Sequence, residues 1–346
     1  MFDSKNPKDI DSKPKDFLQR YFFFPSTGDK ALSFCLLPFS LIYYLGALLS
    51  RAFSKKENLG IRLISIGNLV SGGSGKTPFC IALSNRLHDR GYKNIGIVLR
   101  GYGRQSRGLI QVSRRGEILC GVESSGDEAM LIAMQTRDLK TSVFVSEKRE
   151  AAILLAKEQG LDLVLLDDAY RFRFAKFDIL LEPKISPFYN RVLPSGYYRF
   201  PKSYYKKCDL HLVEGRDYER HTRLKDFCGN SRINNQKDLG GVLDSKRRYV
   251  LATAIANPLR LEPFLEALNH LIVHRHYLPD HAGFSEKSLA SLLEKVGGNC
   301  LLMTQKDLVK CQDFSIPICV MELELSLAPS VISPILSYLE RGLESN

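Results

Sequence analysis

Residues 65–78 read Ser-Ile-Gly-Asn-Leu-Val-Ser-Gly-Gly-Ser-Gly-Lys-Thr-Pro and contain the residue types of a phosphate-binding loop. Glycines let successive backbone N–H groups point into one hollow, and a helix that begins there adds partial positive charge. The Lys76 side chain could neutralise the β- and γ-phosphates of a nucleotide, and the Thr77 hydroxyl could hold Mg²⁺. The pattern predicts binding of a nucleoside triphosphate by Ser71, Gly72, Gly73, Ser74, Gly75, Lys76 and Thr77.

One position departs from the strict motif, because Val70 stands where glycine is usual, five residues before Gly75. A flexible strand-to-helix turn would give a similar string. However, the apolar run from Ile61 to Ile66, the glycine-rich loop, the Lys-Thr pair and a helical pattern follow one another in the required order. This order favours the phosphate-binding interpretation.

Two further groups of residues could take part in the same chemistry. The apolar strand pattern at 161–166 ends in Asp167 and Asp168, an arrangement that holds Mg²⁺ or its waters when it accompanies a phosphate loop. A capped strand-to-helix turn would look the same. Asp280 and His281 follow a later strand pattern on a loop that could face the nucleotide, although a lone histidine is as often structural.

Strand and helix patterns alternate along most of the chain and predict a mostly parallel sheet with helices on both faces. The expected strands are 94–99, 109–113, 117–122, 141–145, 161–167, 208–213, 249–254, 271–276 and 299–303. The expected helices are 75–90, 147–159, 258–269, 285–295 and 328–341, with a further one that begins near Asp127. The fold class is therefore α/β: a P-loop NTPase-like sheet, a second smaller α/β domain and an N-terminal hydrophobic helix.

Composition suggests four regions. Residues 1–60 form a leader with a membrane-associated hydrophobic helix, and 61–213 form the nucleotide-binding core. Residues 214–248 are polar, charged and weakly periodic, which predicts a linker or variable insertion. Residues 249–346 form the second domain, whose last helix could pack back on the core.

The segment 31–49, ALSFCLLPFSLIYYLGALL, is apolar and uncharged, and Pro38 and Gly46 interrupt it. Its length is close to the ~20 residues that span a bilayer. Because the nucleotide loop that follows needs cytosolic nucleotide, the segment either crosses with its amino terminus outside or lies in the interface plane. Pro38 and the short length favour the second arrangement, and a buried core helix is the alternative.

The chain has 49 Lys and Arg against 38 Asp and Glu, a net charge of +11. The excess is concentrated in residues 184–248, where 15 residues are basic and 7 are acidic. Basic residues interleaved with aromatic ones suit a phospholipid surface, a lipid phosphate or single-stranded nucleic acid, or they form a solvated face beside buried tyrosines. The eight scattered cysteines lack metal-site and disulfide spacing and are typical of a reducing compartment.

The order of the motifs resembles the tetraacyldisaccharide 4′-kinase family, whose members phosphorylate a lipid A precursor. The resemblance extends from about Leu32 to Lys310. It rests on the loop at 65–78 and on Arg100-Gly-Tyr-Gly103, Gly126-Asp-Glu128, Asp167-Asp168, Leu193-Pro-Ser-Gly196 with Arg199, Ala254-Ile-Ala-Asn-Pro258, Pro279-Asp-His281 and Thr304-Gln-Lys-Asp307. In this family valine or a similar residue commonly occupies the place of Val70.

The resemblance implies a role for each motif. Lys76 and Thr77 would bind ATP and Mg²⁺, with Asp167 and Asp168 organising the metal. Asp127 would be the general base for the sugar 4′-hydroxyl. His281 would orient that base, and Arg199 would act near the phosphates or the sugar. The product would be lipid IVA, and the partners would be ATP, an acylated disaccharide-1-phosphate lipid and an anionic membrane surface. No nucleic acid is expected, and the location would be the cytoplasmic face of the inner membrane, peripheral or through one N-terminal segment.

Some residues depart from the family pattern. Its Asp-Asp-Gly-Phe-Gln-His string is Asp-Asp-Ala-Tyr-Arg-Phe at 167–172 here, and Gln305 replaces a glutamate. Both aspartates are retained, so the changes concern their surroundings. Two other functions remain as alternatives: a membrane-associated P-loop ATPase or NTPase switch without a lipid acceptor, and a non-enzymatic membrane or nucleic-acid binder.

Overall fold

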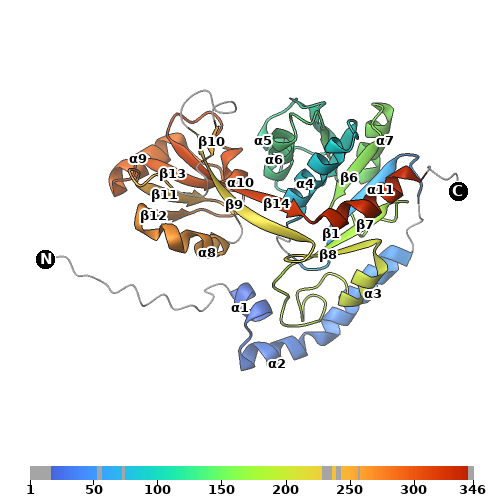
Figure 1. Ribbon diagram of the computed structural model, residues 1–346. Coiled ribbons are helices and arrows are strands. Elements are labelled where there is room, and N and C mark those ends of the chain that lie inside the picture. Colours follow the sequence, from blue (N-terminus) through green and yellow to red (C-terminus); the bar gives the residue numbers. More distant parts are fainter. Residues whose placement is uncertain are drawn as a thin grey trace.

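The computed structural model describes residues 17–52, 57–71, 75–227, 236–238, 243–255 and 258–341. Their backbone forms two sheets that lie side by side, with three helices near the amino terminus below the first sheet (Figure 1). The α/β fold class predicted from the sequence is confirmed, with a large, mostly parallel first sheet and a smaller second one.

The first sheet has eight strands in the order β4-β3-β5-β2-β6-β1-β7-β8. Six of them, from β5 to β8 in this order, pair in parallel, and the β3–β4 hairpin pairs antiparallel to β5. The strands are β1 (Arg62–Asn68), β2 (Ile95–Leu99), β3 (Ile110–Arg114), β4 (Glu117–Ile118), β5 (Ser142–Val145), β6 (Leu163–Asp167), β7 (Phe177–Glu182) and β8 (Leu210–Val213).

Alternate residues of the central strands point to opposite faces of this sheet, and helices cover both faces. Ile64 of β1 packs toward α4 (Lys76–Asp89), α6 (Asp127–Gln135) and the last helix, α11 (Ile332–Glu340). Its neighbour Leu63 packs toward α7 (Arg149–Glu158) on the other face. The short α5 (Val122–Ser125) precedes α6, and the 3₁₀ helix η1 (Lys202–Lys207) lies in the segment between β7 and β8.

The second sheet has six strands in the order β10-β9-β14-β13-β11-β12. Its strands are β9 (Tyr218–Phe227), β10 (Gln236–Asp238), β11 (Tyr249–Thr253), β12 (Ile272–Tyr277), β13 (Cys300–Thr304) and β14 (Ile318–Leu327). One face packs against η2 (Pro258–Leu261), α8 (Glu262–Leu265) and η3 (Glu266–Leu271), and the other against α9 (Glu286–Val296). The short helices α10 (Gln305–Leu308) and η4 (Pro329–Val331) follow β13 and β14.

The antiparallel pair β9–β14 joins the two sheets, and its ten residue pairs run without a register shift (Figure 1). Residues 214–248, expected to be a linker or variable insertion, contribute at least β9 and β10 to the second sheet, so this stretch is more than a linker. Strand β9 gave little signal because, among its residues whose burial is described (218–226), only Tyr218, Leu224 and Asp226 are buried, and polar residues dominate its sequence. Strands β7 and β14 were not expected either.

Three helices precede the first strand: α1 (Phe17–Phe23), α2 (Thr27–Cys35) and α3 (Leu37–Ala52). Ser26 and Asp29 form a capping box at the start of α2. Among the described residues no single helix has both the length and the apolar composition needed to cross a bilayer. Helix α2 and α3 as far as Leu49 meet that test only together, and they bend by 50° where they join. The single hydrophobic helix expected over 31–49 is therefore a bent pair.

Candidate active site

The end of β1 and the start of α4 form the loop predicted to bind phosphate. Gly75 has φ 82°, a left-handed conformation that favours glycine, and it caps α4, which begins at Lys76. Thr77 lies in the first turn of this helix, and the Ser71 backbone N–H donates to Tyr197 O at 2.9 Å. Gly72, Gly73 and Ser74, which were also predicted to bind phosphate, lie outside the described residues. The first turn of α4 therefore directs Lys76 and a partial positive charge toward the carboxyl end of the sheet.

Lys76 and Arg199 converge on Asp168. Lys76 Nζ lies 3.9 Å from Asp168 Oδ1 and 3.2 Å from Asn68 Oδ1, and Arg199 Nη1 donates to Asp168 Oδ2 at 2.8 Å. The Arg199 backbone N–H also donates to Leu69 O at 2.6 Å, which fixes the Arg199 loop against the end of β1. Burial acts to raise the pKa of Asp168, but Lys76 and Arg199 outweigh it and hold that pKa below its usual value. Asp168 is therefore an anion between two cations.

Asp167 ends β6 and has a different environment. Its side chain is buried, and its Oδ1 has no hydrogen-bond partner among the described residues. Burial, opposed by Lys76, raises the pKa of Asp167 to about 7. The buried Arg149 side chain donates to Asp167 O at 3.1 Å, and burial lowers the pKa of Arg149 to about 10.

These residues fit a magnesium ion that also binds phosphate. Mg²⁺ commonly takes only one or two protein carboxylates and completes its coordination with waters and phosphate oxygens. In the part of the chain that the structure describes, no three His, Cys, Asp or Glu side chains cluster as metal ligands. The unpartnered oxygen of Asp167, the adjacent Asp168 and the Thr77 hydroxyl supply the sparse donor set that such an ion requires.

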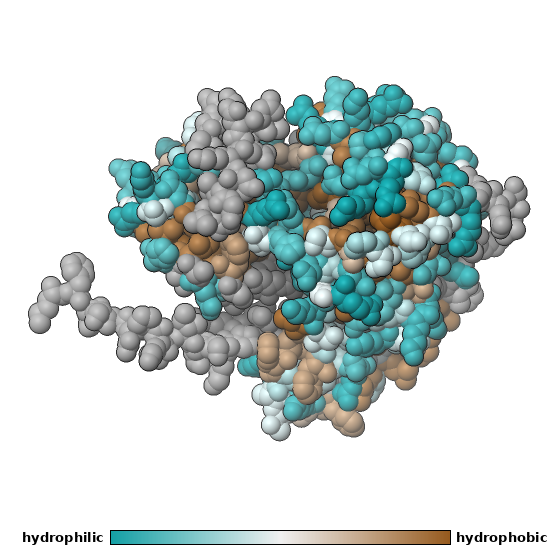
Figure 2. Space-filling model, in the orientation of Figure 1, coloured by the Kyte–Doolittle hydropathy of each residue, from teal (hydrophilic) through white to brown (hydrophobic). Residues whose placement is uncertain are grey.

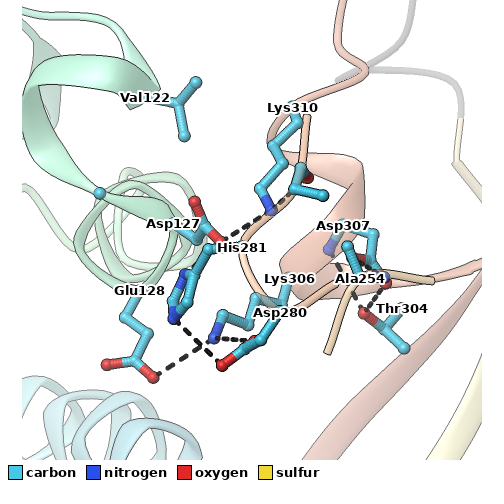
Figure 3. Close-up of polar contacts among 12 residues, drawn as sticks. Val122, Asp127, Glu128, Ala254, Asp280, His281, Thr304, Lys306, Asp307 and Lys310 are labelled. Atoms are coloured by element: carbon cyan, nitrogen blue, oxygen red, sulfur yellow. Dashed lines mark hydrogen bonds and ion pairs between the residues drawn. The ribbon is translucent and has the colours of Figure 1, made fainter. Parts of the chain in front are cut away.

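In the other part of the site, Asp127, the first residue of α6, meets the second domain (Figure 3). His281 Nδ1 lies 3.0 Å from Asp127 Oδ2, and Lys310 Nζ lies 2.9 Å from the same oxygen. The Asp127 side chain is 9% exposed, so these two groups and the helix N-terminus are its principal surroundings. Asp127 is thus a largely buried carboxylate whose partners come from a different domain.

A second row of charges lies beside this contact (Figure 3). Lys306 Nζ is 3.8 Å from Glu128 Oε1 and 4.0 Å from Asp280 Oδ1, and Asp280 Oδ2 is 3.5 Å from His281 Nε2. The negative charge of Glu128 also raises the pKa of Asp167, so this acid of α6 acts electrostatically on the aspartate that ends β6.

The loop that carries His281 is held in an unusual conformation. His281 has φ 62°, and its backbone N–H donates to Ala254 O at 3.0 Å. On the opposite side, a Cβ added to Gly103 would lie 3.0 Å from His281 Nδ1, so the imidazole packs directly on the 100–104 loop. Gly103 itself has φ 74°. Only glycine satisfies both constraints there without strain.

Asp307 holds the short helix α10 against the end of β11. Its carboxylate accepts from Thr253 Oγ1 at 2.6 Å, from Ala254 N at 3.0 Å and from Thr304 Oγ1 at 2.6 Å. Thr304 is also the N-cap of α10, and Asp307 is fully buried. Because Ala254 O in turn accepts from His281 N, one frame supports both the α10 segment and the His281 loop.

The structure brings the predicted residues into two groups at the same edge of the sheet. Lys76, Thr77, Asp167, Asp168 and Arg199 surround the phosphate loop, and Asp127 meets His281. Sequence analysis missed Lys310 as a site residue. The residues Glu128, Asp280, Lys306 and Asp307 were noticed only as parts of motifs. The spacing from Thr304 to Lys310 was a signal, since a capped turn places Asp307 and Lys310 on one side.

The replaced residues after Asp168 pack without disturbing the two aspartates. Ala169 is fully buried, and Arg171 lies 4.8 Å from the centre of the Phe172 ring, which Arg149 at the start of α7 approaches to 6.0 Å. Gln305 Nε2 donates to Glu322 Oε1 at 2.6 Å. A glutamate at position 305 would place two carboxylates against each other there, so glutamine suits its neighbour.

The fold and the site together define a class of protein. A parallel sheet with a phosphate loop, two strand-end aspartates and a carboxylate supported by a second domain is typical of phosphotransferases that use a nucleoside triphosphate.

Comparisons identify the family. The model of the family described as tetraacyldisaccharide-1-P 4′-kinase matches residues 32–340, and this chain belongs to that family. A protein named tetraacyldisaccharide 4′-kinase from Helicobacter acinonychis (strain Sheeba) is 42% identical over 325 residues, which cover 94% of this chain and 95% of that protein. One of the same name from Campylobacter jejuni subsp. jejuni is 40% identical over 327 residues, covering 94% and 96%. The resemblance drawn from the motifs is confirmed.

A solved structure is consistent with this family assignment. The crystal structure described as the "apo" form of LpxK from Aquifex aeolicus in complex with ATP superimposes with a TM-score of 0.71 at 25% identity. The comparison covers 89% of this chain and 99% of that one. The two-sheet arrangement is thus shared with that protein over almost its whole length.

We predict that Asp307→Ala destabilises the second domain. The substitution leaves three donors without their acceptor in a buried place, at a cost of about 3 kcal/mol in the free energy of unfolding. Urea unfolding followed by circular dichroism measures this. The matched control is Asp313→Ala, at an exposed position just beyond the same helix, which should stay within about 0.5 kcal/mol of the parent. Equal effects of the two substitutions would contradict the role assigned to Asp307.

Proposed function

We propose that this protein transfers the γ-phosphate of ATP to the 4′-hydroxyl of a tetraacylated glucosamine disaccharide-1-phosphate. Family membership and the relatives named tetraacyldisaccharide 4′-kinase support this activity, and the related structure in complex with ATP supports the choice of nucleotide. The observation in the molecule that carries the proposal is the contact of Asp127 with His281 across the two domains, at the same sheet edge as Lys76.

In this reaction Asp127 takes the proton of the 4′-hydroxyl as the sugar oxygen attacks the γ-phosphorus. The bond between that phosphorus and the β,γ-bridging oxygen breaks, and ADP leaves with the electron pair. His281 fixes the orientation of the Asp127 carboxylate through their 3.0 Å contact. Lys76 and Arg199 place positive charge beside the phosphates, and the α4 N-terminus adds to it. Most of the rate enhancement in such a transfer comes from alignment and charge stabilisation.

Asp167, Asp168 and Thr77 would hold Mg²⁺ in this site. When bound, the ion neutralises charge on the β- and γ-phosphate oxygens. The buried, unpartnered Oδ1 of Asp167 supports this assignment, since a buried carboxylate oxygen without a partner is costly unless a ligand satisfies it.

The protein would act at the cytoplasmic face of the inner membrane. Large apolar side chains of α2 and α3 are exposed, among them Phe34 at 68%, Phe39 at 59% and Ile42 at 67%. In Figure 2 brown and tan side chains gather along the edge where Figure 1 places these helices. An exposed apolar face of this kind suits an interfacial location.

Basic residues lie next to this apolar face. Lys30 of α2 contacts the ring of Phe188, which is 55% exposed, and Lys206 and Lys207 are exposed on η1. Most aromatic residues of the basic tract pack inward instead: Tyr189, Tyr198, Tyr204 and Tyr205 are all buried. The cationic side chains, together with Phe188 and Ile185, are therefore the part of the tract available to anionic phospholipid.

The buried polar contacts of α2 and α3 tie this face to the site. Ser33 Oγ donates to Ser195 O at 2.8 Å, and Ser40 Oγ donates to Val192 O at 2.9 Å. The same loop continues to Arg199, which binds Asp168. A lipid substrate held at the apolar face would therefore lie along the loop that leads to the phosphate site.

The first functional prediction concerns the transfer itself. Purified protein incubated with Mg·ATP and the tetraacylated disaccharide-1-phosphate should yield a product heavier by one phosphate, located on the 4′-oxygen by tandem mass spectrometry. Asp127→Asn should lower kcat by about 10²–10⁴-fold, because the general base is lost, with ATP binding retained in calorimetry. Asp138→Asn, an exposed position beyond the other end of α6, is the control. Release of phosphate from ATP at a rate that does not depend on the lipid would instead indicate an ATPase.

The second functional prediction concerns the metal ion. Excess EDTA should abolish transfer, and MgCl₂ should restore it. Asp167→Asn should lower kcat by about 10²-fold and raise the Mg²⁺ concentration needed for half-maximal rate, because it replaces a ligand oxygen that also carries charge. Asp162→Asn, at the other end of β6, should behave as the parent. An unchanged Mg²⁺ requirement in Asp167→Asn would remove Asp167 from the metal site.

The third functional prediction concerns binding to the membrane. The protein should sediment with vesicles that contain phosphatidylglycerol, and added salt should weaken this binding. In Phe34→Glu/Ile42→Glu the vesicle partition coefficient should fall by about 10²-fold, since burial of two large apolar side chains contributes roughly 3 kcal/mol or more. Leu119→Glu changes another exposed apolar residue, directly after β4 and away from α2 and α3, and should bind as the parent does. Equal loss in both variants would contradict docking through α2 and α3.

A further inference from the structure

Lys310 has the environment of a functional side chain rather than of a surface lysine. Its side chain is 8% exposed, and its ammonium lies 2.9 Å from Asp127 Oδ2. The ammonium also donates to Ala282 O at 3.1 Å and lies 5.9 Å from the centre of the Phe284 ring. An ammonium with so little access to water needs an anionic partner. Asp127, which belongs to the other domain, is that partner.

The contacts of Asp127 are asymmetric. The shortest contacts of His281 and of Lys310 both fall on Oδ2, so neither occupies Oδ1 in its place (Figure 3). Two donors that approach one carboxylate oxygen from different segments restrict rotation of the whole group. They also leave the second oxygen to accept a proton from a substrate.

We propose that Lys310 is a positioning residue for the phosphate transfer: it clamps Oδ2 of Asp127 and presents Oδ1 to the attacking hydroxyl. This inference rests on the function proposed above. In it the lysine does not touch the substrate and acts through the base.

The surrounding contacts show why Lys310 rather than its neighbour has this role. Lys306, one turn earlier, lies 3.8 Å from Glu128 and 4.0 Å from Asp280, so its ammonium pairs with those two acids. The backbone N–H of Lys310 donates to Asp307 O at 3.1 Å, and Asp307 is anchored to the end of β11. The Ala282 carbonyl that Lys310 binds is next to His281. Both donors to Asp127 therefore move together with the second domain.

The test compares Lys310→Met with Lys310→Arg. Methionine keeps much of the length and removes the charge, so Asp127 keeps only His281 as a donor. We expect kcat to fall about 10²-fold, the usual consequence of misplacing a catalytic group by about 1 Å, with the KM for ATP unchanged. Lys310→Arg keeps a cationic donor and should recover a substantial part of kcat. Lys295→Met, on the exposed face of α9, is the control.

A double variant tests the shared oxygen. Because His281 and Lys310 bind the same Oδ2, their effects should be coupled, and His281→Ala/Lys310→Met should lose less activity than the product of the two single losses. If the activity lost in the double variant equals the product of the two single losses, His281 and Lys310 act independently, and the proposal that Lys310 positions Asp127 is overturned.

The remaining outcomes are also decisive. If parent protein fails to phosphorylate the lipid, the proposed function falls and Lys310 has no reaction to support. If the parent is active and Lys310→Met retains kcat within twofold, the Lys310 proposal alone is overturned. It is overturned as well if Lys310→Met loses ATP binding or melts earlier in proportion to its lost activity and Lys310→Arg does no better, because Lys310 would then only hold the domains together.

Discussion

The chemistry of this molecule depends on one carboxylate that receives its partners from another domain. Asp127 starts α6 in the first domain, whereas His281 and Lys310 approach its Oδ2 from the second. Because both partners of this largely buried carboxylate belong to the second domain, its side chain is held in place only while the two domains stay together. In the reaction proposed above, this contact makes the arrangement of the two domains a condition for proton transfer, so the phosphate loop alone would be insufficient.

The rest of the second domain can be understood as support for that contact. Strands β9 and β14 pair over ten residues and set the distance between the sheets. Near the same junction Glu322 of β14 pairs with Lys225 of β9 and accepts from Gln135 of α6 and from Gln305 of α10. These polar contacts connect the β9–β14 strand pair to both domains. Asp307 then orients α10, and with it the lysine that reaches the base.

Much of the first domain could be predicted from the sequence, because buried parallel strands are continuous apolar runs and its helices have a clear periodicity. The end of β6 and the loop before α4 could also be predicted as parts of a site, because polar residues interrupt an apolar pattern at Asp167 and Lys76. Strand β9 could not be recognised, since its pairing with β14 stabilises a mostly polar stretch. Lys310 was missed because only the tertiary fold removes it from water, and a lysine after a short helix looks like any exposed one.

The residues that differ from the family pattern show which features the site tolerates. Asp168 has φ 52° and its N–H donates to Ile66 O at 2.9 Å, so the backbone at the end of β6 is fixed by β1 rather than by the residues that follow. Phe172 can therefore stack on Phe174 at 5.8 Å and lie under Arg171 without moving either aspartate. Side chains beyond Asp168 face a local aromatic cluster, whereas Lys76 and Arg199 bind Asp168 itself. Substitution is accordingly permitted next to Asp167 and Asp168 as long as the strand register that holds them is preserved.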